Sequence, residues 1–160
     1  MIRIAHFSDL HYGTKNLAEA DRCFGAAIDR AIARVLDRGW FILGPEVEAF
    51  EKELAAAMGV KDAVSMANGT DALILALEVK GIGPGDEVIT SPMSAAFSAL
   101  AISRLGATPV FGDVDPVTMN LDPATIEARI TPRTRGILPV HLYGHPADLD
   151  PIMDIARRHN

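Results

Sequence analysis

Short apolar runs alternate with segments of helical periodicity along most of the chain, and few architectures accommodate this order. The spacing predicts helices over 17–38, 45–58, 70–79, 94–104, 122–130 and from 148 to the C-terminus. It predicts strands over 2–7, 62–67, 87–91, 108–113 and 135–141. Near-continuous apolar strands that alternate with helices indicate an α/β fold with a mostly parallel sheet, flanked by helices on both faces.

The last predicted helix should feed a further strand in such a series. An open parallel sheet of four or five strands would then keep one unfinished edge, which is exposed to mispairing with other chains. We therefore expect the chain to be a fragment of a larger sheet, truncated at its C-terminus.

The composition and the net charge of the chain exclude several classes of function. Apolar residues make up 49% of the chain and the formal net charge is −6, so we expect a real core and neither a nucleic-acid nor an anionic-membrane surface. No apolar run approaches the roughly 18 residues of a membrane span, and the N-terminus lacks the apolar stretch of a signal peptide. The single cysteine, Cys23, excludes an internal disulfide. These features predict a cytoplasmic protein.

The strongest local signal for a binding site is the stretch SMANGTDAL at 65–73. Asn68 can cap the helix that follows, and Gly69 and Thr70 begin it. Free N–H groups at a helix N-terminus favour anions, a glycine lets a phosphate approach the main chain, and Thr70 adds a hydroxyl donor. A plain helix cap after a glycine turn explains the same residues, and the spacing alone favours that simpler interpretation.

Asp9 and His11 form a second signal, directly after the first predicted strand. A carboxylate and an imidazole two residues apart at a strand end can both reach one divalent metal ion. A solvated turn with a capping aspartate is the alternative, because a dinuclear centre needs several more ligands. His141 and His145 are four residues apart, but a glycine and a proline interrupt any helix that would bring them to one face.

Five stretches then occur in register between about residues 32 and 160: RVLDRGWFILGPEVEAFEKELAAAMGV, ANGTDALILAL, GIGPGDEVIT, GATPVFGDVDP and LDPATIEARITPRTRGILPVHLYGHPADLDPI. They resemble the N-terminal part of the DegT/StrS family of nucleotide-sugar aminotransferases. The resemblance implies part of the large domain of a fold-type I pyridoxal 5'-phosphate (PLP) enzyme that acts as a homodimer. Such enzymes transfer an amino group, usually from glutamate, to a keto group of a nucleotide-linked sugar.

The resemblance also implies roles for individual residues. Asn68, Gly69 and Thr70 match the motif that holds the cofactor phosphate. The position whose aromatic side chain usually stacks on the pyridine ring falls on Ala95, so Phe97, two places later, is the candidate for stacking. The Schiff-base lysine and the aspartate that pairs with the pyridine nitrogen belong to a region downstream of the match. We therefore assign no catalytic residue and expect no transamination from this chain.

Residues 1–31 resemble a different family, the calcineurin-like metallophosphoesterases, in which a strand and a DxH turn supply the first metal ligands, here Asp9 and His11. The chain therefore divides into a metallophosphoesterase-like segment, 1–31, and an aminotransferase-like fragment, 32–160, and we hypothesise a chimeric reading frame. A metal-dependent phosphoesterase or nuclease fragment is one alternative function. A non-catalytic remnant that binds phosphate ligands, or that pairs with a full-length aminotransferase, is another.

Overall fold

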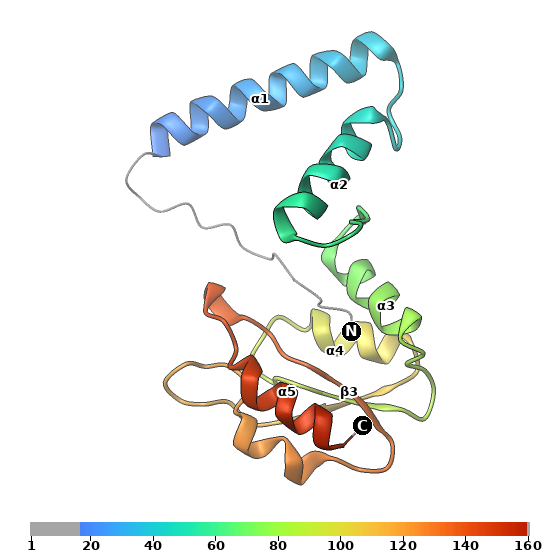
Figure 1. The fold of residues 1–160 in the computed structure, drawn as a ribbon, viewed down its shortest axis with the longest axis vertical. Helices are drawn as coiled ribbons and strands as arrows, with labels where there is room; N and C mark the ends of the chain where they lie inside the picture. Colours follow the sequence, from blue (N-terminus) through green and yellow to red (C-terminus); the bar gives the residue numbers. More distant parts are fainter. Residues whose placement is uncertain (1–16, 160) are drawn as a thin grey trace. The chain divides into compact units, whose positions relative to one another are not determined.

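The computed structural model of the protein describes residues 17–159 (Figure 1). These residues form two compact units that divide between Met66 and Ala67. The first unit contains α1 (Leu17–Arg38) and α2 (Pro45–Met58), whose bounds agree with the predicted helices. The strand predicted over 2–7 lies outside the described residues.

A three-stranded parallel sheet forms the centre of the second unit, with the order β2-β1-β3. The strands are β1 (Glu87–Thr90), β2 (Thr108–Phe111) and β3 (Thr134–Leu138). All four residues of the central strand are buried. The predicted parallel α/β class is confirmed, although the sheet has three strands within the described residues and not four or five.

Helices cover both faces of the sheet, as predicted. α3 (Gly69–Val79) and α4 (Phe97–Arg104) cover one face, and α5 (Leu149–Arg158) covers the other. Successive residues of a strand point to opposite faces, so Val88 packs against α3 and α4 whereas Ile89 packs against α5. The buried residues around Val88 are Leu73, Leu77, Ile82, Ala101, Ile102, Ala107 and Leu138. Those around Ile89 are Leu121, Ile126, Ile152 and Ile155.

The strand predicted over 62–67 is wrong, because residues 62–66 belong to no helix or strand of the described chain. A strand needs a neighbour that takes its backbone hydrogen bonds, and a sequence window does not show whether that neighbour exists. Here the backbone N–H of Ser65 donates to Oε1 of Glu51, on α2, at 2.7 Å. A helix side chain therefore takes a hydrogen bond that a neighbouring strand would otherwise take.

The α-helix predicted over 122–130 is wrong in type. Asp122 caps the segment as expected, but the residues form two 3-10 turns, η1 (Pro123–Thr125) and η2 (Glu127–Arg129). The hydroxyl of Thr125 donates to the carbonyl of Asp122 at 2.8 Å and accepts from the N–H of Asp113 at 3.1 Å. Such side-chain bonds to the backbone compete with the α-helical pattern.

The helix predicted over 94–104 begins three residues late, at Phe97. Ser91 Oγ accepts the N–H of Met93 at 3.2 Å, so the chain turns before the helix starts. The predicted helix from 148 is confirmed as α5, which begins at Leu149. Among the residues that the structure describes, no helix combines the length and apolarity needed to cross a membrane.

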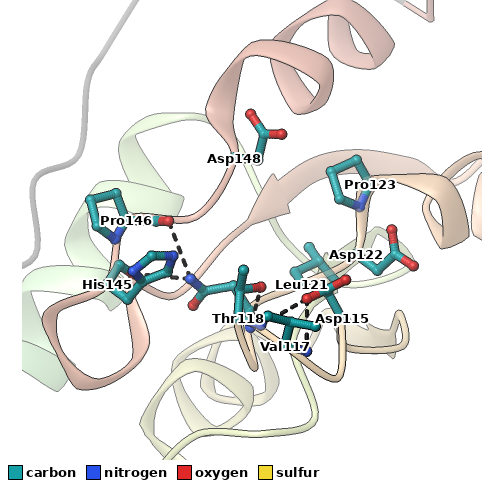
Figure 2. Close-up of a pocket in the computed structure, with 10 residues that line it drawn as sticks. Asp115, Val117, Thr118, Leu121, Asp122, Pro123, His145, Pro146 and Asp148 are labelled. Carbon is teal, nitrogen blue, oxygen red and sulfur yellow. Dashed lines mark hydrogen bonds between the residues drawn. The ribbon is translucent and has the colours of Figure 1, made fainter.

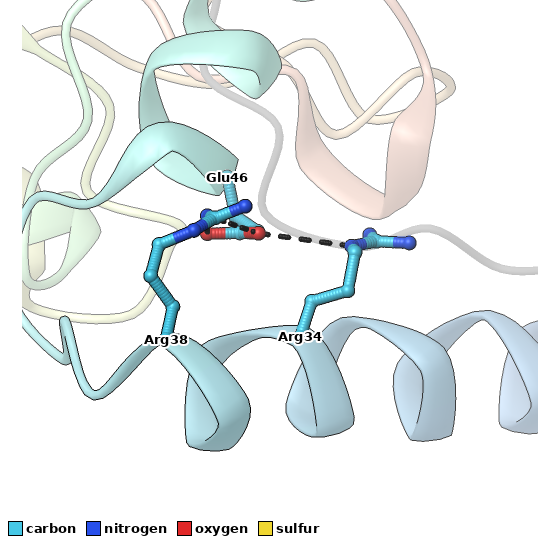
Figure 3. Close-up of polar contacts among 3 residues, drawn as sticks. All are labelled: Arg34, Arg38 and Glu46. Carbon is cyan, nitrogen blue, oxygen red and sulfur yellow. Dashed lines mark hydrogen bonds and ion pairs between the residues drawn. The ribbon is translucent and has the colours of Figure 1, made fainter.

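The turn between α1 and α2 is held by Glu46, in the first turn of α2 (Figure 3). Its carboxylate accepts two hydrogen bonds from Nη1 of Arg38, at 2.9 and 3.0 Å, and lies 3.6 Å from Nε of Arg34. The backbone N–H of Glu46 itself, and then Arg38 and Arg34, lower the pKa of this carboxyl group. Exposed ion pairs of this kind orient a turn more than they stabilise it.

Candidate functional site

One edge of the sheet gathers the features expected of a ligand site. In a parallel sheet the carboxyl ends of all strands lie at the same edge, and ligands of open α/β sheets bind there. α4 follows β1 and α5 follows β3, so their N-terminal turns begin from this edge. α3 ends just before β1 begins, which directs its N-terminus to the same edge.

Asn68 is the N-cap of α3, as predicted. Its backbone is extended (φ −159°, ψ 167°), and its Oδ1 accepts the N–H of Asp71 at 2.9 Å. Its Nδ2 donates to Oδ2 of Asp71 at 2.7 Å, so the two side chains brace each other. The Asn68 side chain therefore defines where α3 begins, and both ends of its amide group are used within the cap. This agrees with the simpler of the two interpretations of the sequence, a plain helix cap.

The N-terminus of α3 still has backbone N–H groups that are free to donate hydrogen bonds to a ligand. The N–H of Asp71 goes to the Asn68 side chain, and the N–H of Ala72 goes to the Asn68 carbonyl at 3.2 Å. The N–H groups of Gly69 and Thr70, the first two helical residues, have no partner within the helix. Together with the hydroxyl of Thr70, which is a half-buried residue, and the positive end of the helix dipole, this donor set fits a phosphate group.

The lysine that the structure describes in the second unit does not complete such a site. Lys80 is the only lysine of the second unit among the described residues, and it is the C-cap of α3. It follows the 11 residues of that helix, so roughly 16 Å of helix separate it from Gly69 and Thr70. An amine at that distance cannot reach a cofactor whose phosphate lies at the helix N-terminus.

Phe97 is the first residue of α4, and 55% of its surface is exposed. Ala96, the N-cap, supplies no side-chain hydrogen bond to this helix. α3 and α4 are in contact and contribute Leu77 and Ile102 to one buried cluster, and both N-termini are directed to the same edge of the sheet. An exposed aromatic ring thus begins the helix next to the one that carries Asn68, Gly69 and Thr70. Whether it lies over a bound ring stays a prediction.

The hollow of about 660 Å³ in the second unit lies elsewhere (Figure 2). Two loops form it, one over 115–123 and one over 145–148. Its lining residues are Asp115, Val117, Thr118, Asn120, Leu121, Asp122, Pro123, His145, Pro146 and Asp148. None of the site residues proposed from the sequence is among them.

Asn120 joins these two loops and is only 3% exposed. Its Nδ2 donates to the carbonyls of His145, at 3.0 Å, and Pro146, at 3.2 Å. Its Oδ1 accepts the N–H of Leu142 at 3.0 Å. Sequence reasoning missed this residue, because nothing in the stretch around it separates a buried bridging amide from an ordinary turn asparagine.

The two histidines of the HLYGH stretch act separately, as their spacing indicated. Nδ1 of His141 accepts the N–H of Ala147 at 2.9 Å. His145 contributes its backbone carbonyl to Asn120. Across the described part of the chain, no group of three or more His, Cys, Asp or Glu side chains could hold a metal ion. Asp9 and His11, the predicted metal ligands, lie outside the described residues.

A parallel sheet with helices on both faces, and a glycine-threonine helix N-terminus at its carboxyl edge, defines an α/β domain suited to phosphorylated ligands. The sequence profile of the DegT/DnrJ/EryC1/StrS aminotransferase family matches residues 22–160. The chain belongs to this family. The resemblance found in the sequence over 32–160 is thereby confirmed.

Individual relatives agree with this assignment. The dTDP-3-amino-3,4,6-trideoxy-alpha-D-glucose transaminase of Streptomyces venezuelae is 54% identical over 134 residues, covering 84% of this chain and 35% of that protein. The structure of S. venezuelae DesV in complex with a ketimine intermediate matches with a TM-score of 0.84 and 52% identity, over 89% of this chain and 38% of DesV. NtdA from Bacillus subtilis with bound cofactor PMP matches with a TM-score of 0.80 and 39% identity, over 82% and 30% of the two chains.

The chain spans about a third of the length of the relatives that it matches. The aminotransferases of the family are PLP-dependent and act on nucleotide sugars with an amino donor. The matched relatives and solved structures give no support for the metal-dependent alternative.

Proposed function

We propose that this chain carries the cofactor-phosphate site of a PLP-dependent sugar aminotransferase. The observation that carries the proposal is the N-terminus of α3, where Asn68 fixes the cap and Gly69 and Thr70 present free donors. The resemblance to the family implies the same role for these residues. A phosphate needs several convergent N–H and O–H donors, and this turn supplies two N–H groups and one hydroxyl.

Each residue has a separate part in the proposed site. Gly69 and Thr70 bind the phosphate, and Asn68 holds the first helical turn in position. Phe97, exposed at the start of α4, would exclude water from one face of the cofactor ring. Bound PLP supplies the reactive carbonyl and the electron-withdrawing ring on which amino transfer depends.

The proposed substrates are a keto sugar linked to a nucleotide and an amino donor such as glutamate. We expect this chain to bind cofactor without completing amino transfer, because Lys80, the only described lysine of the second unit, is held at the far end of α3. Purified protein incubated with PLP, glutamate and a keto nucleotide sugar should release no 2-oxoglutarate above background. Clear turnover would show that another lysine reaches the site.

Homodimer formation is the proposed assembly, and the first unit supports it. Three side chains at helical spacing on α1 are exposed although apolar: Ile28 (42%), Ile32 (52%) and Leu36 (61%). The four consecutive apolar residues 40–43 that follow α1 are exposed as well. An apolar stripe of this length usually marks a contact surface between proteins.

The cofactor proposal is tested by removing donors without removing the helix. Gly69→Pro deletes one N–H at the first helical position, where proline is well tolerated, and Asn68 already has the extended backbone that precedes proline. Thr70→Val deletes the hydroxyl and keeps the shape. Each change should weaken binding of pyridoxamine 5'-phosphate about tenfold or more, since each removes a hydrogen bond to a charged group. Isothermal titration calorimetry measures this effect.

Two comparisons make the experiment specific. Thr108→Val, at an exposed threonine that begins β2 at the opposite edge of the sheet, should leave the affinity unchanged. Pyridoxamine without its phosphate should bind the unmodified chain at least tenfold more weakly than the phosphate ester, by the same reasoning. Equal affinities for the two ligands would rule out a phosphate site at α3.

The division of the chain near residue 31 stays a proposal. The boundary falls within α1 (Leu17–Arg38), and the family match begins at residue 22, ten residues before the predicted start of the aminotransferase-like fragment at residue 32. The metallophosphoesterase-like assignment of Asp9 and His11 stays a prediction as well.

A further inference from the structure

Tyr143 has a backbone conformation that its residue type does not favour. Its φ is 54° and its ψ is 26°, and Gly144, the next residue, has φ 76°. The N–H of His145 donates to the carbonyl of Leu142 at 2.9 Å and closes the turn. Two successive residues with positive φ in a turn closed this way define a type I′ turn, whose first central position favours Asn, Asp or Gly.

Folding of the described chain does not explain a tyrosine at this position. A residue with a Cβ is less stable in the left-handed region than in the right-handed one, because its Cβ then lies too close to the following carbonyl oxygen. Burial of the ring could offset this cost, but 79% of the Tyr143 surface is exposed. Asparagine would relieve the strain and give up little packing.

The loop that carries Tyr143 is nevertheless held firmly. Asn120 hydrogen-bonds to the backbone on both sides of the turn, at Leu142 and at His145 and Pro146. The ring of His141 takes the N–H of Ala147, which closes the loop across its base. An exposed aromatic ring on a strained and well-supported turn is typical of a residue preorganised for a contact.

We propose that Tyr143 is a ligand-binding residue, on whose exposed ring a flat heterocycle stacks at the carboxyl edge of the sheet. The inference rests on the proposed function, which brings two such rings to this edge: the nucleobase of a nucleotide sugar and the pyridine ring of the cofactor. Stacking of a base on an aromatic side chain strengthens binding, and it needs a free ring face such as the one Tyr143 presents.

The surroundings favour a small ligand over a protein partner. The hollow adjoins this turn at His145 and is bordered by the carboxylates of Asp115, Asp122 and Asp148, and Tyr143 itself does not line it. Charged residues are depleted from the cores of protein interfaces. A small-molecule site instead combines an aromatic surface with a few polar groups that fix orientation.

Two substitutions at Tyr143 distinguish the effect of its aromatic ring from the effect of its backbone strain. Tyr143→Asn removes the ring and relieves the turn, whereas Tyr143→Phe keeps both ring and strain. Leu43→Asn is the matched control, because Leu43 also has positive φ (49°) and is 73% exposed, in the first unit. We expect both asparagine variants to melt about 2–4 °C higher than the unmodified chain.

Ligand binding is then measured by calorimetry with uridine diphosphate and with pyridoxamine 5'-phosphate, using pyrophosphate as the ring-free comparison. Tyr143→Asn should weaken one of the two ring-bearing ligands about tenfold, and the ligand affected identifies which ring Tyr143 holds. Tyr143→Phe should leave both affinities within about twofold, since it keeps the stacking ring.

The inference fails if Tyr143→Asn leaves both affinities unchanged, if Tyr143→Phe is equally damaging, or if the unmodified chain binds neither ligand. A variant that loses self-association in sedimentation while keeping its ligand affinities would assign Tyr143 to a protein interface instead. The outcomes are separable from those of the phosphate proposal. If the unmodified chain does not bind pyridoxamine 5'-phosphate, the phosphate proposal is wrong. Binding of uridine diphosphate then still tests the proposal for Tyr143.

Discussion

Asn120→Asp is expected to lower the free energy of unfolding by about 3–5 kcal/mol. One carboxylate oxygen can still accept the N–H of Leu142, but the other replaces an NH₂ group that donates to two carbonyls, at 3.0 and 3.2 Å. A carboxylate oxygen then faces the carbonyl oxygens of His145 and Pro146, at a position where the native side chain is only 3% exposed. Both the lost donors and the buried negative charge act against the fold.

The pH dependence of this variant provides an internal check. Burial and the two facing carbonyls raise the pKa of the new carboxyl group above its unfolded value of about 4. At pH values above this folded-state pKa, the variant therefore shows the full loss of unfolding free energy. This loss shrinks as the pH falls through that value, because the protonated acid again donates to a carbonyl. Urea unfolding followed by circular dichroism at pH 7 and pH 4 measures both deficits.

Val117→Asn is the control for a polar change in the same loop. Val117 is 87% exposed, so its replacement should alter the free energy of unfolding by less than about 0.5 kcal/mol. A small effect of Asn120→Asp at pH 7 would mean that the two loops are not joined through this amide. The support inferred for the Tyr143 turn would then be lost as well.

The parts of the fold that the sequence predicted well are those that depend on short-range information. Helical periodicity, a proline at the first position and a glycine after the end predicted α2 correctly, and Gly59 indeed has the left-handed conformation (φ 63°) of a helix C-cap. The strand expected over 62–67 failed because pairing depends on residues far along the chain. Its composition suits a strand, yet the Ser65 N–H donates to Glu51.

For the candidate site, too, local features could be predicted from the sequence and long-range features could not. Asn68, Gly69 and Thr70 could be proposed from the sequence because a helix cap and a phosphate turn are local motifs. Asn120 and Tyr143 could not. The role of Asn120 depends on carbonyls 25 and 26 residues away, and the strain at Tyr143 is a backbone property that its residue type conceals.

The two-faced core leads to a second prediction with a large effect, at the central strand. Ile89→Ala should destabilise the protein by about 2–5 kcal/mol, because the side chain is fully buried (0% exposed) and its removal leaves a cavity. Ile102→Ala, at an equally buried residue on the opposite face of the sheet, should have a similar cost. Denaturant unfolding of each variant gives the individual values.

The double variants then test whether the sheet separates the two halves of the core. Ile89 and Ile152 belong to one cluster and share neighbours, so their combined effect should depart from the sum by about 0.5 kcal/mol or more. Ile89 and Ile102 belong to different clusters, so their effects should add within about 0.5 kcal/mol. Strong coupling across the sheet would instead indicate a single continuous core, in which the strand transmits rearrangements from α5 to the helices that carry the proposed phosphate site.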